Sequence, residues 1–321
     1  MNPLSAPSAD LWRLLARAMD TPTREHIGLF DALGLAAPDA LEALQAAHAE
    51  AFVTQCAPYV SVYVGETGQI GGEAAARVAD FRRLLGAEVD ADASDAIADV
   101  LADYADLVAL AADDAQAAHA RVALFWEHIA PWAGVFADAL IRSAPAPYDG
   151  WAGLFQAALG AEAVNLPAPT ALALHLRAAP GWQPPADDAT HADVARALLV
   201  PVTTGVVLTR ADLATAGAEL GIALPVGGRA FLLETLFRAD TPATEAWLAG
   251  EAARQADARA VDVETLGETA RFWVERAFAA EERLSAAGDR RLGPRAAHRN
   301  TRGHGNASNE ASTPGHEELM S

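Results

Sequence analysis

The sequence contains no lysine, so all 23 of its basic residues are arginine. Without lysine, the chain cannot form a Schiff base with a carbonyl substrate, and it cannot carry the lysine of a Walker phosphate-binding loop. It has one cysteine, Cys56, which excludes an internal disulfide and a metal site built from cysteines. Runs of valine and isoleucine are rare, so there is little material for a large β-sheet.

Long apolar runs and targeting segments are also missing. No stretch of 18 uncharged apolar residues occurs, so we expect no membrane span. The first residues, MNPLSAPSADLW, have no basic segment followed by an apolar core, so we expect no signal peptide. A cytoplasmic location fits these expectations and the single cysteine.

The net charge of the chain is −20. Phosphate binding requires clustered cations, so a chain this acidic is expected to repel nucleic acid. The same charge attracts basic peptides over a long range, with a strength that salt reduces. The alternative is that the acidity only keeps an alanine-rich protein in solution.

Signature motifs of common enzyme and metal sites do not occur. H-E-x-x-H and G-x-S-x-G are absent, and the Asp-Asp pairs at 113–114 and 187–188 lack the third acid of an Asp-rich magnesium site. His119 and His128 are too far apart in sequence to bind one metal at helical spacing. The sequence therefore predicts no catalytic residue, metal ligand or cofactor, and it favours a binding function.

Alanine-rich, helix-forming segments make up most of the chain. They predict an all-α fold, a multi-helix bundle of about 10–12 helices in two packed lobes. The run over residues 119–141 has apolar side chains at steps of three and four, and its two tryptophans and two phenylalanines indicate a central position. Pro131 in its middle is expected to kink or split the helix.

Residues 58–72 read PYVSVYVGETGQIGG, in which tyrosine and serine alternate with valine before four glycines. The alternation suits a short strand, and the glycines predict a loop. Their spacing matches neither the dinucleotide-binding nor the Walker pattern, so we do not expect the loop to hold phosphate. The tyrosines are expected to pack between helices and turns.

Changes in composition divide the chain into four parts. We expect a helical domain over residues 1–162 and a C-terminal helical region over 190–285, joined by a proline-rich connection over 163–189. Over residues 286–321, glycine, arginine, asparagine, serine and histidine replace apolar residues, which predicts a disordered tail. A monomer and a dimer are both compatible with this organisation.

Three segments, in order, resemble the TorD/DmsD/NarJ group of redox-enzyme maturation chaperones. The central helix contains ALFWEHIAPW, which is similar to the Glu-His and Pro-Trp arrangement of that group. Upstream, residues 51–86 contain a Pro-Tyr-x-Ser-x-Tyr pattern, a glycine pair and an Arg-x-x-x-Phe helix. Residues 198–222, LLVPVTTGVVLTRADLATAGAELGI, are similar to a C-terminal segment of longer members.

The resemblance implies that residues 1–162 are a TorD-like helical chaperone domain in a cytoplasmic protein without enzymatic activity. Such a chaperone binds the twin-arginine signal peptide and the apo form of a molybdopterin-containing oxidoreductase catalytic subunit, assists cofactor insertion and delays export. The group commonly has a Pro-x-Asp-His loop. Here Asp95 takes the aspartate position, but Ala96 replaces the histidine and the proline is missing, which bears on how a client would bind.

A twin-arginine signal has two arginines followed by an apolar stretch. A groove with an aromatic floor and an acidic rim would complement both parts. We therefore predict a peptide-binding site formed by Tyr59, Tyr63, Asp95, Trp126, Glu127, His128 and Trp132. Core packing is the alternative for the aromatic side chains, a structural hydrogen bond is the alternative for Glu127 and His128, and a helix cap is the alternative for Asp95.

Two other functions are compatible with the sequence. A helical enzyme would hold a metal or a small ligand between helices, with acids and histidines converging in one pocket. A helical scaffold would recruit a partner through the arginine-bearing tail rather than through the body of the protein.

Overall fold

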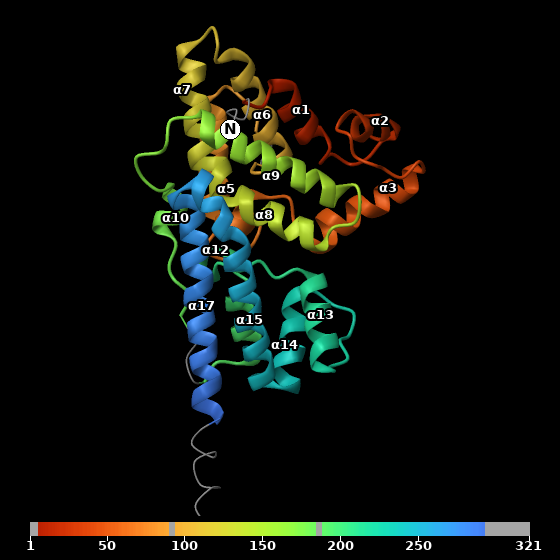
Figure 1. The fold of residues 1–321 in the computed structure, drawn as a ribbon, viewed down its shortest axis with the longest axis vertical. Helices are drawn as coiled ribbons and strands as arrows, with labels where there is room; N and C mark the ends of the chain where they lie inside the picture. The colour runs from red at the N-terminus through yellow and green to blue at the C-terminus, as the bar shows by residue number, and fades with distance from the viewer. Residues whose placement is uncertain (1–5, 90–93, 184–187, 293–321) are drawn as a thin grey trace, which may run out of the picture.

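A computed structural model describes residues 6–89, 94–183 and 188–292. Over these ranges the chain is built from helices, and its one β-type contact is an isolated antiparallel bridge between Tyr59 and Ala96. The predicted all-α fold is confirmed. Figure 1 shows an upper lobe made by the N-terminal helices and a lower lobe made by the C-terminal helices, with the last long helix running along both.

Helices of the upper lobe are joined by short connections. In chain order they are α1 (Ala9–Arg17), α2 (Arg24–Ala32), α3 (Leu41–His48), η1 (Ala49–Gln55), α4 (Val60–Val64), α5 (Gly72–Leu84), α6 (Ile97–Leu110), α7 (Ala115–Ala123), η2 (Leu124–Ile129), α8 (Ala130–Ser143) and α9 (Tyr148–Asn165).

The remaining helices form the connection, the lower lobe and the return to the upper lobe. They are α10 (Leu174–Ala178), α11 (His191–Leu198), α12 (Pro201–Thr204), α13 (Arg210–Leu220), α14 (Arg229–Ala239), α15 (Thr241–Arg259), η3 (Ala260–Asp262), α16 (Val263–Leu266) and α17 (Glu268–Leu292).

Polar side chains at helix ends place several of these boundaries. Ser8 accepts a hydrogen bond from the Leu11 N–H at the start of α1, and Thr209 and Asp212 form a capping box at the start of α13. At α15 the capping side chain is Asp240, which accepts the Ala243 N–H. Such side chains satisfy N–H groups that have no partner within the helix.

The run predicted over 119–141 is part of a longer helical path formed by α7, η2 and α8, which we call the central helix. Its middle segment, η2, is π-helical, and Pro131 lies directly after it in the first turn of α8. Because proline has no N–H, the hydrogen-bond pattern changes at this point while the helical path continues. Phe125, Trp132 and Phe136 on this path are fully buried.

The short strand suggested for residues 59–64 is wrong, because this segment forms the one-turn helix α4. Pairing with the segment before α6 is limited to the single bridge between Tyr59 and Ala96. The Asp95 carboxylate accepts the Ser61 N–H at 2.7 Å. This bond caps the first turn of α4, so the backbone turns into a helix instead of extending the pairing.

Two hydrophobic cores lie inside the molecule. The first is formed in the upper lobe, and the second, which includes Trp182 and Trp247, in the lower lobe. Helix α17 contributes Trp273 to the first core and Leu284 to the second, and Figure 1 shows it spanning both lobes. Helix α17 is therefore shared by the two lobes. The predicted division of the chain into separate domains on either side of residues 163–189 stays a prediction.

Some helix ends differ from the expected boundaries. Helix α9 ends at Asn165, past the expected domain end at residue 162. Helix α17 continues through residues 286–292, which we expected to be disordered, and the rest of the predicted tail lies outside the described residues. Within the described ranges, every helix is too short or too polar to cross a membrane.

A buried polar cluster joins three helices of the upper lobe. The Glu162 carboxylate on α9 is fully buried and accepts hydrogen bonds from the Tyr104 hydroxyl on α6 and the Arg121 guanidinium on α7. The Arg121 Nε lies 2.8 Å from Glu162 Oε1. Since a buried carboxylate is stable only when its charge is compensated, this ion pair fixes the positions of α6, α7 and α9 relative to one another.

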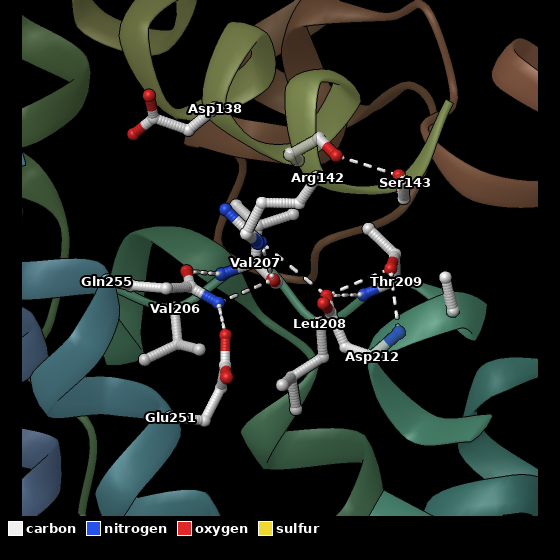
Figure 2. A network of polar contacts seen from close by, with 12 residues as sticks. Asp138, Arg142, Ser143, Val206, Val207, Leu208, Thr209, Asp212, Glu251 and Gln255 are labelled. Atoms are coloured by element: carbon white, nitrogen blue, oxygen red, sulfur yellow. Dashed lines mark hydrogen bonds and ion pairs between the residues drawn. The ribbon is translucent and has the colours of Figure 1, made fainter. Parts of the chain in front are cut away.

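Residues 206–208, which lie outside the helices, join the two lobes because side chains from both lobes form hydrogen bonds with their backbone. Figure 2 shows the Gln255 amide facing Val207: it accepts the Val207 N–H and donates to the Val207 carbonyl, each at 3.0 Å. Arg142, at the end of α8 in the upper lobe, donates to the same carbonyl at 3.1 Å and lies 3.5 Å from Asp212. Side chains thus replace the neighbouring strand that this valine-rich segment lacks.

We expect Gln255→Ala to lower the free energy of unfolding by about 1–3 kcal/mol, because it leaves the buried Val207 N–H without an acceptor. Urea unfolding monitored by circular dichroism measures this change. Gln45→Ala is the control, since Gln45 is exposed and bonds only to the Pro22 carbonyl. Equal effects of the two substitutions would contradict the role given to Gln255.

Candidate functional site

Most of the seven predicted peptide-binding residues are buried. Tyr63, Trp126 and Trp132 belong to the first core, and His128 and Asp95 are buried with them, while Tyr59 and Glu127 are half-buried. The three core aromatics therefore do not form a floor open to solvent, and the predicted trough must be corrected at these positions. Packing between helices removes the large apolar area of these side chains from water, which is energetically favourable.

Asp95 and Tyr63 stabilise the backbone at and before α4 through hydrogen bonds. Asp95 caps α4 through the Ser61 N–H, and the Tyr63 hydroxyl donates to the Ala57 carbonyl at 3.0 Å. The Ser61 hydroxyl in turn accepts the Gly71 N–H at 3.0 Å. These bonds connect the buried residues to the glycine-containing loop that follows α4.

The loop after α4 needs its glycines. Gly71 has φ of +96° and Gly72 has φ of +74°, a region that side chains with a Cβ rarely adopt. Gly68 also has a positive φ, and a Cβ there would lie 3.1 Å from the Leu199 carbonyl of the lower lobe. The loop is therefore held in one path between α4 and α5 and lies directly against the lower lobe.

A polar cleft of about 140 Å³ opens between this loop, the first turns of α5, and α10. It is lined by Val64, Gly65, Glu66, Thr67, Gly71, Gly72, Glu73, Ala74, Arg77, His175 and Ala178. Two carboxylates border it, and one of them, Glu73, pairs with Arg77. Ile70 and Leu174, which neighbour lining residues in sequence, are 55% and 45% exposed. The lining thus leaves Glu66 as the carboxylate without an ion-pair partner among the described residues, and the exposed apolar side chains lie next to the cleft and not in its lining.

Beneath the cleft lies a pair of histidines from distant parts of the chain. The rings of His128 and His175 are 5.6 Å apart, and the His128 ring packs against Phe81 at 4.7 Å. Burial, together with the nearby His175, lowers the pKa of His128 to about 3. Burial, together with Arg77, lowers the pKa of His175 to about 4. Both imidazoles are therefore neutral at pH 7.

The histidine pair belongs to a larger contact between the central helix and residues 167–178, which we call the covering segment. The Trp126 indole N–H donates to the Pro167 carbonyl at 2.9 Å. The Glu127 carboxylate accepts the Leu174 N–H at 3.0 Å. Three consecutive residues of η2 thus contact one segment from the connection between the lobes.

The cleft contains residues that the sequence did not single out, above all Glu66, Glu73, Arg77 and His175. A partial signal was present, because Arg77 begins the Arg-x-x-x-Phe pattern whose Phe81 contacts His128. No spacing rule places His175 beside a residue of the central helix. Within the described residues, no group of three or more histidine, cysteine, aspartate or glutamate side chains is arranged to hold a metal ion.

The lowered pKa values of the two histidines predict a loss of stability in acid. In the unfolded chain the two imidazoles take up protons near pH 6.5, and in the folded chain they do so only near pH 3–4. The free energy of unfolding therefore falls as the pH decreases from about 6.5 toward 3–4. We expect His175→Phe to reduce the loss between pH 7.5 and pH 5 by about 1–2 kcal/mol, measured by chemical denaturation. His119→Phe, on an exposed position, should keep the wild-type loss. An unchanged loss in His175→Phe would rule this explanation out.

Comparison with known proteins extends over part of the chain. Residues 4–138 match the family model described as nitrate reductase delta subunit. The matched range includes the glycine loop, α5 and His128, and it ends within α8, before α10 and the lower lobe. No curated protein matches this chain, and no solved structure matches it. Over residues 4–138, slightly less than half of its length, this chain is therefore similar to the nitrate reductase delta subunit family.

Proposed function

We propose that this protein is a cytoplasmic chaperone that binds the twin-arginine signal peptide of a molybdopterin-containing oxidoreductase catalytic subunit and delays its export until the cofactor is inserted. The observation that carries the proposal is the cleft beside α5, which lies largely within the region that matches the family. The Glu66 carboxylate in the cleft and the exposed Ile70 side chain beside it would complement the two parts of such a signal peptide.

Charge supports the first part of this recognition. Glu66 is exposed at the cleft and forms no ion pair with another described residue, so its carboxylate is available to an arginine of the peptide. Arginine and carboxylate form charge-assisted and often bidentate hydrogen bonds. The net charge of −20 also increases the rate of encounter with a basic peptide.

Exposed apolar surface supports the second part. Ile70, in the glycine loop beside the cleft, is a large apolar residue that faces solvent. Contact with the apolar stretch of a signal peptide would remove its side chain from water, which is the main source of affinity in peptide grooves. The buried residues predicted from the sequence would then support the site from below.

The test is a titration with a synthetic signal peptide from a molybdopterin oxidoreductase encoded beside this gene. We expect the peptide to bind at least about tenfold more tightly than a version with both arginines replaced by alanine. Glu66→Gln should weaken binding of the arginine peptide about three- to tenfold and reduce its salt dependence. Isothermal titration calorimetry at two salt concentrations measures both effects.

Glu42→Gln serves as the control, because Glu42 is an exposed acid on α3, in another part of the upper lobe. It should bind the peptide as the wild-type protein does. Equal affinity for the arginine and alanine peptides would contradict the proposed recognition of the arginine pair.

A further inference from the structure

The covering segment is held at a few points only. Residues 167–171 are exposed, and the buried anchors are Ala173, His175 and Leu176. The N-cap residue of α10, Ala173, has no side-chain acceptor, so Glu127 on the central helix supplies the missing acceptor for the Leu174 N–H. A helix of five residues does not form alone in water, so α10 depends on this contact and on its apolar anchors.

The composition of the covering segment resembles that of the ligand proposed for the neighbouring cleft. From Thr170 to Ala178 it reads TALALHLRA, with three leucines at alternate positions followed by Arg177. His175 and Ala178 of this segment form one wall of the cleft. An apolar stretch with an arginine thus already lies on the surface of Trp126, Glu127 and His128.

We propose that the covering segment is an internal competitor of the signal peptide: it lies over Trp126–His128 when no client is bound, and the apolar stretch of the client displaces it. This inference depends on the proposed function and adds a means of regulation to it. Displacement would expose the half-buried Glu127 carboxylate and the indole edge of Trp126 to the peptide. The affinity that a client experiences is then its intrinsic affinity reduced by the fraction of molecules in which the segment is open.

Two substitutions break the same hydrogen bond from opposite sides. Leu174→Pro removes the donor N–H; proline is tolerated at the first position of a helix, and Ala173, with φ of −52° and ψ of 144°, has a conformation compatible with a following proline. Glu127→Ala removes the acceptor. In the free protein, both should accelerate hydrogen exchange of the Leu176, Arg177 and Ala178 amides by about tenfold.

We expect Leu174→Pro to bind the signal peptide about three- to tenfold more tightly than wild type, because the segment is open in a larger fraction of molecules. A synthetic peptide of residues 167–178 should compete with the signal peptide for this variant. Glu127→Ala distinguishes two roles of the carboxylate. Binding as tight as that of Leu174→Pro means that it only holds the segment, and binding weaker than that of Leu174→Pro means that it also contacts the client once the segment opens.

Asp114→Ala is the matched control. It removes a similar cap, the bond from the Gln116 N–H at 2.8 Å, from α7 of the same central helix. Neither exchange in the covering segment nor peptide affinity should change in this variant.

The outcomes separate this inference from the proposed function. If Leu174→Pro accelerates exchange but binds the signal peptide no more tightly than wild type, the competition is overturned and the proposed function stands. If neither the wild-type protein nor Leu174→Pro binds the peptide, the proposed function and the proposed competition are both contradicted. Binding by Leu174→Pro without binding by wild type would support the competition in its strongest form.

Discussion

Pro131 has no backbone N–H, so the helix that contains it cannot keep an unchanged ladder of hydrogen bonds. The chain responds with the π-helical segment η2 directly before α8, and the indole N–H of Trp273 from α17 donates to the Pro131 carbonyl at 2.8 Å. The central helix therefore continues through the core. Its π-helical segment carries Trp126, Glu127 and His128, the residues on which the covering segment lies.

The same central helix also joins the lobes. Its last two turns carry Arg142, which reaches the backbone of Val207 in the lower lobe, and Asp138, whose carboxylate accepts a hydrogen bond from Arg259 at 2.9 Å. Arg259 is fully buried, and it also donates to the Gly205 carbonyl. Because buried charges are stable only with partners, these contacts specify one arrangement of the two lobes. The same arrangement fixes the position of the cleft, because the glycine loop that borders the cleft lies against the lower lobe at Gly68.

Much of the fold could be predicted from the sequence, because helix periodicity and capping depend on residues close together in the chain. The central helix is an example. The strand suggested for residues 59–64 was wrong because the alternation of valine and tyrosine was counted without the Asp95 side chain, which caps a helical turn there.

The candidate site was less predictable than the fold. Aromatic residues in a helix are equally compatible with core packing and with a binding site. Tyr63 and Trp132 are buried in the core. The contact of His175 with His128 and the bond from Leu174 to Glu127 join segments about 47 residues apart. Such contacts follow from tertiary packing, and no local pattern encodes them.

The central claim is that a client peptide binds at the cleft and replaces the covering segment on the central helix. Hydrogen exchange of the full chain with and without a bound signal peptide tests it most directly. We predict slower exchange over residues 64–74 of the glycine loop and α5, together with faster exchange over residues 174–178. Slower exchange in both ranges, or changes confined to the lower lobe, would contradict it.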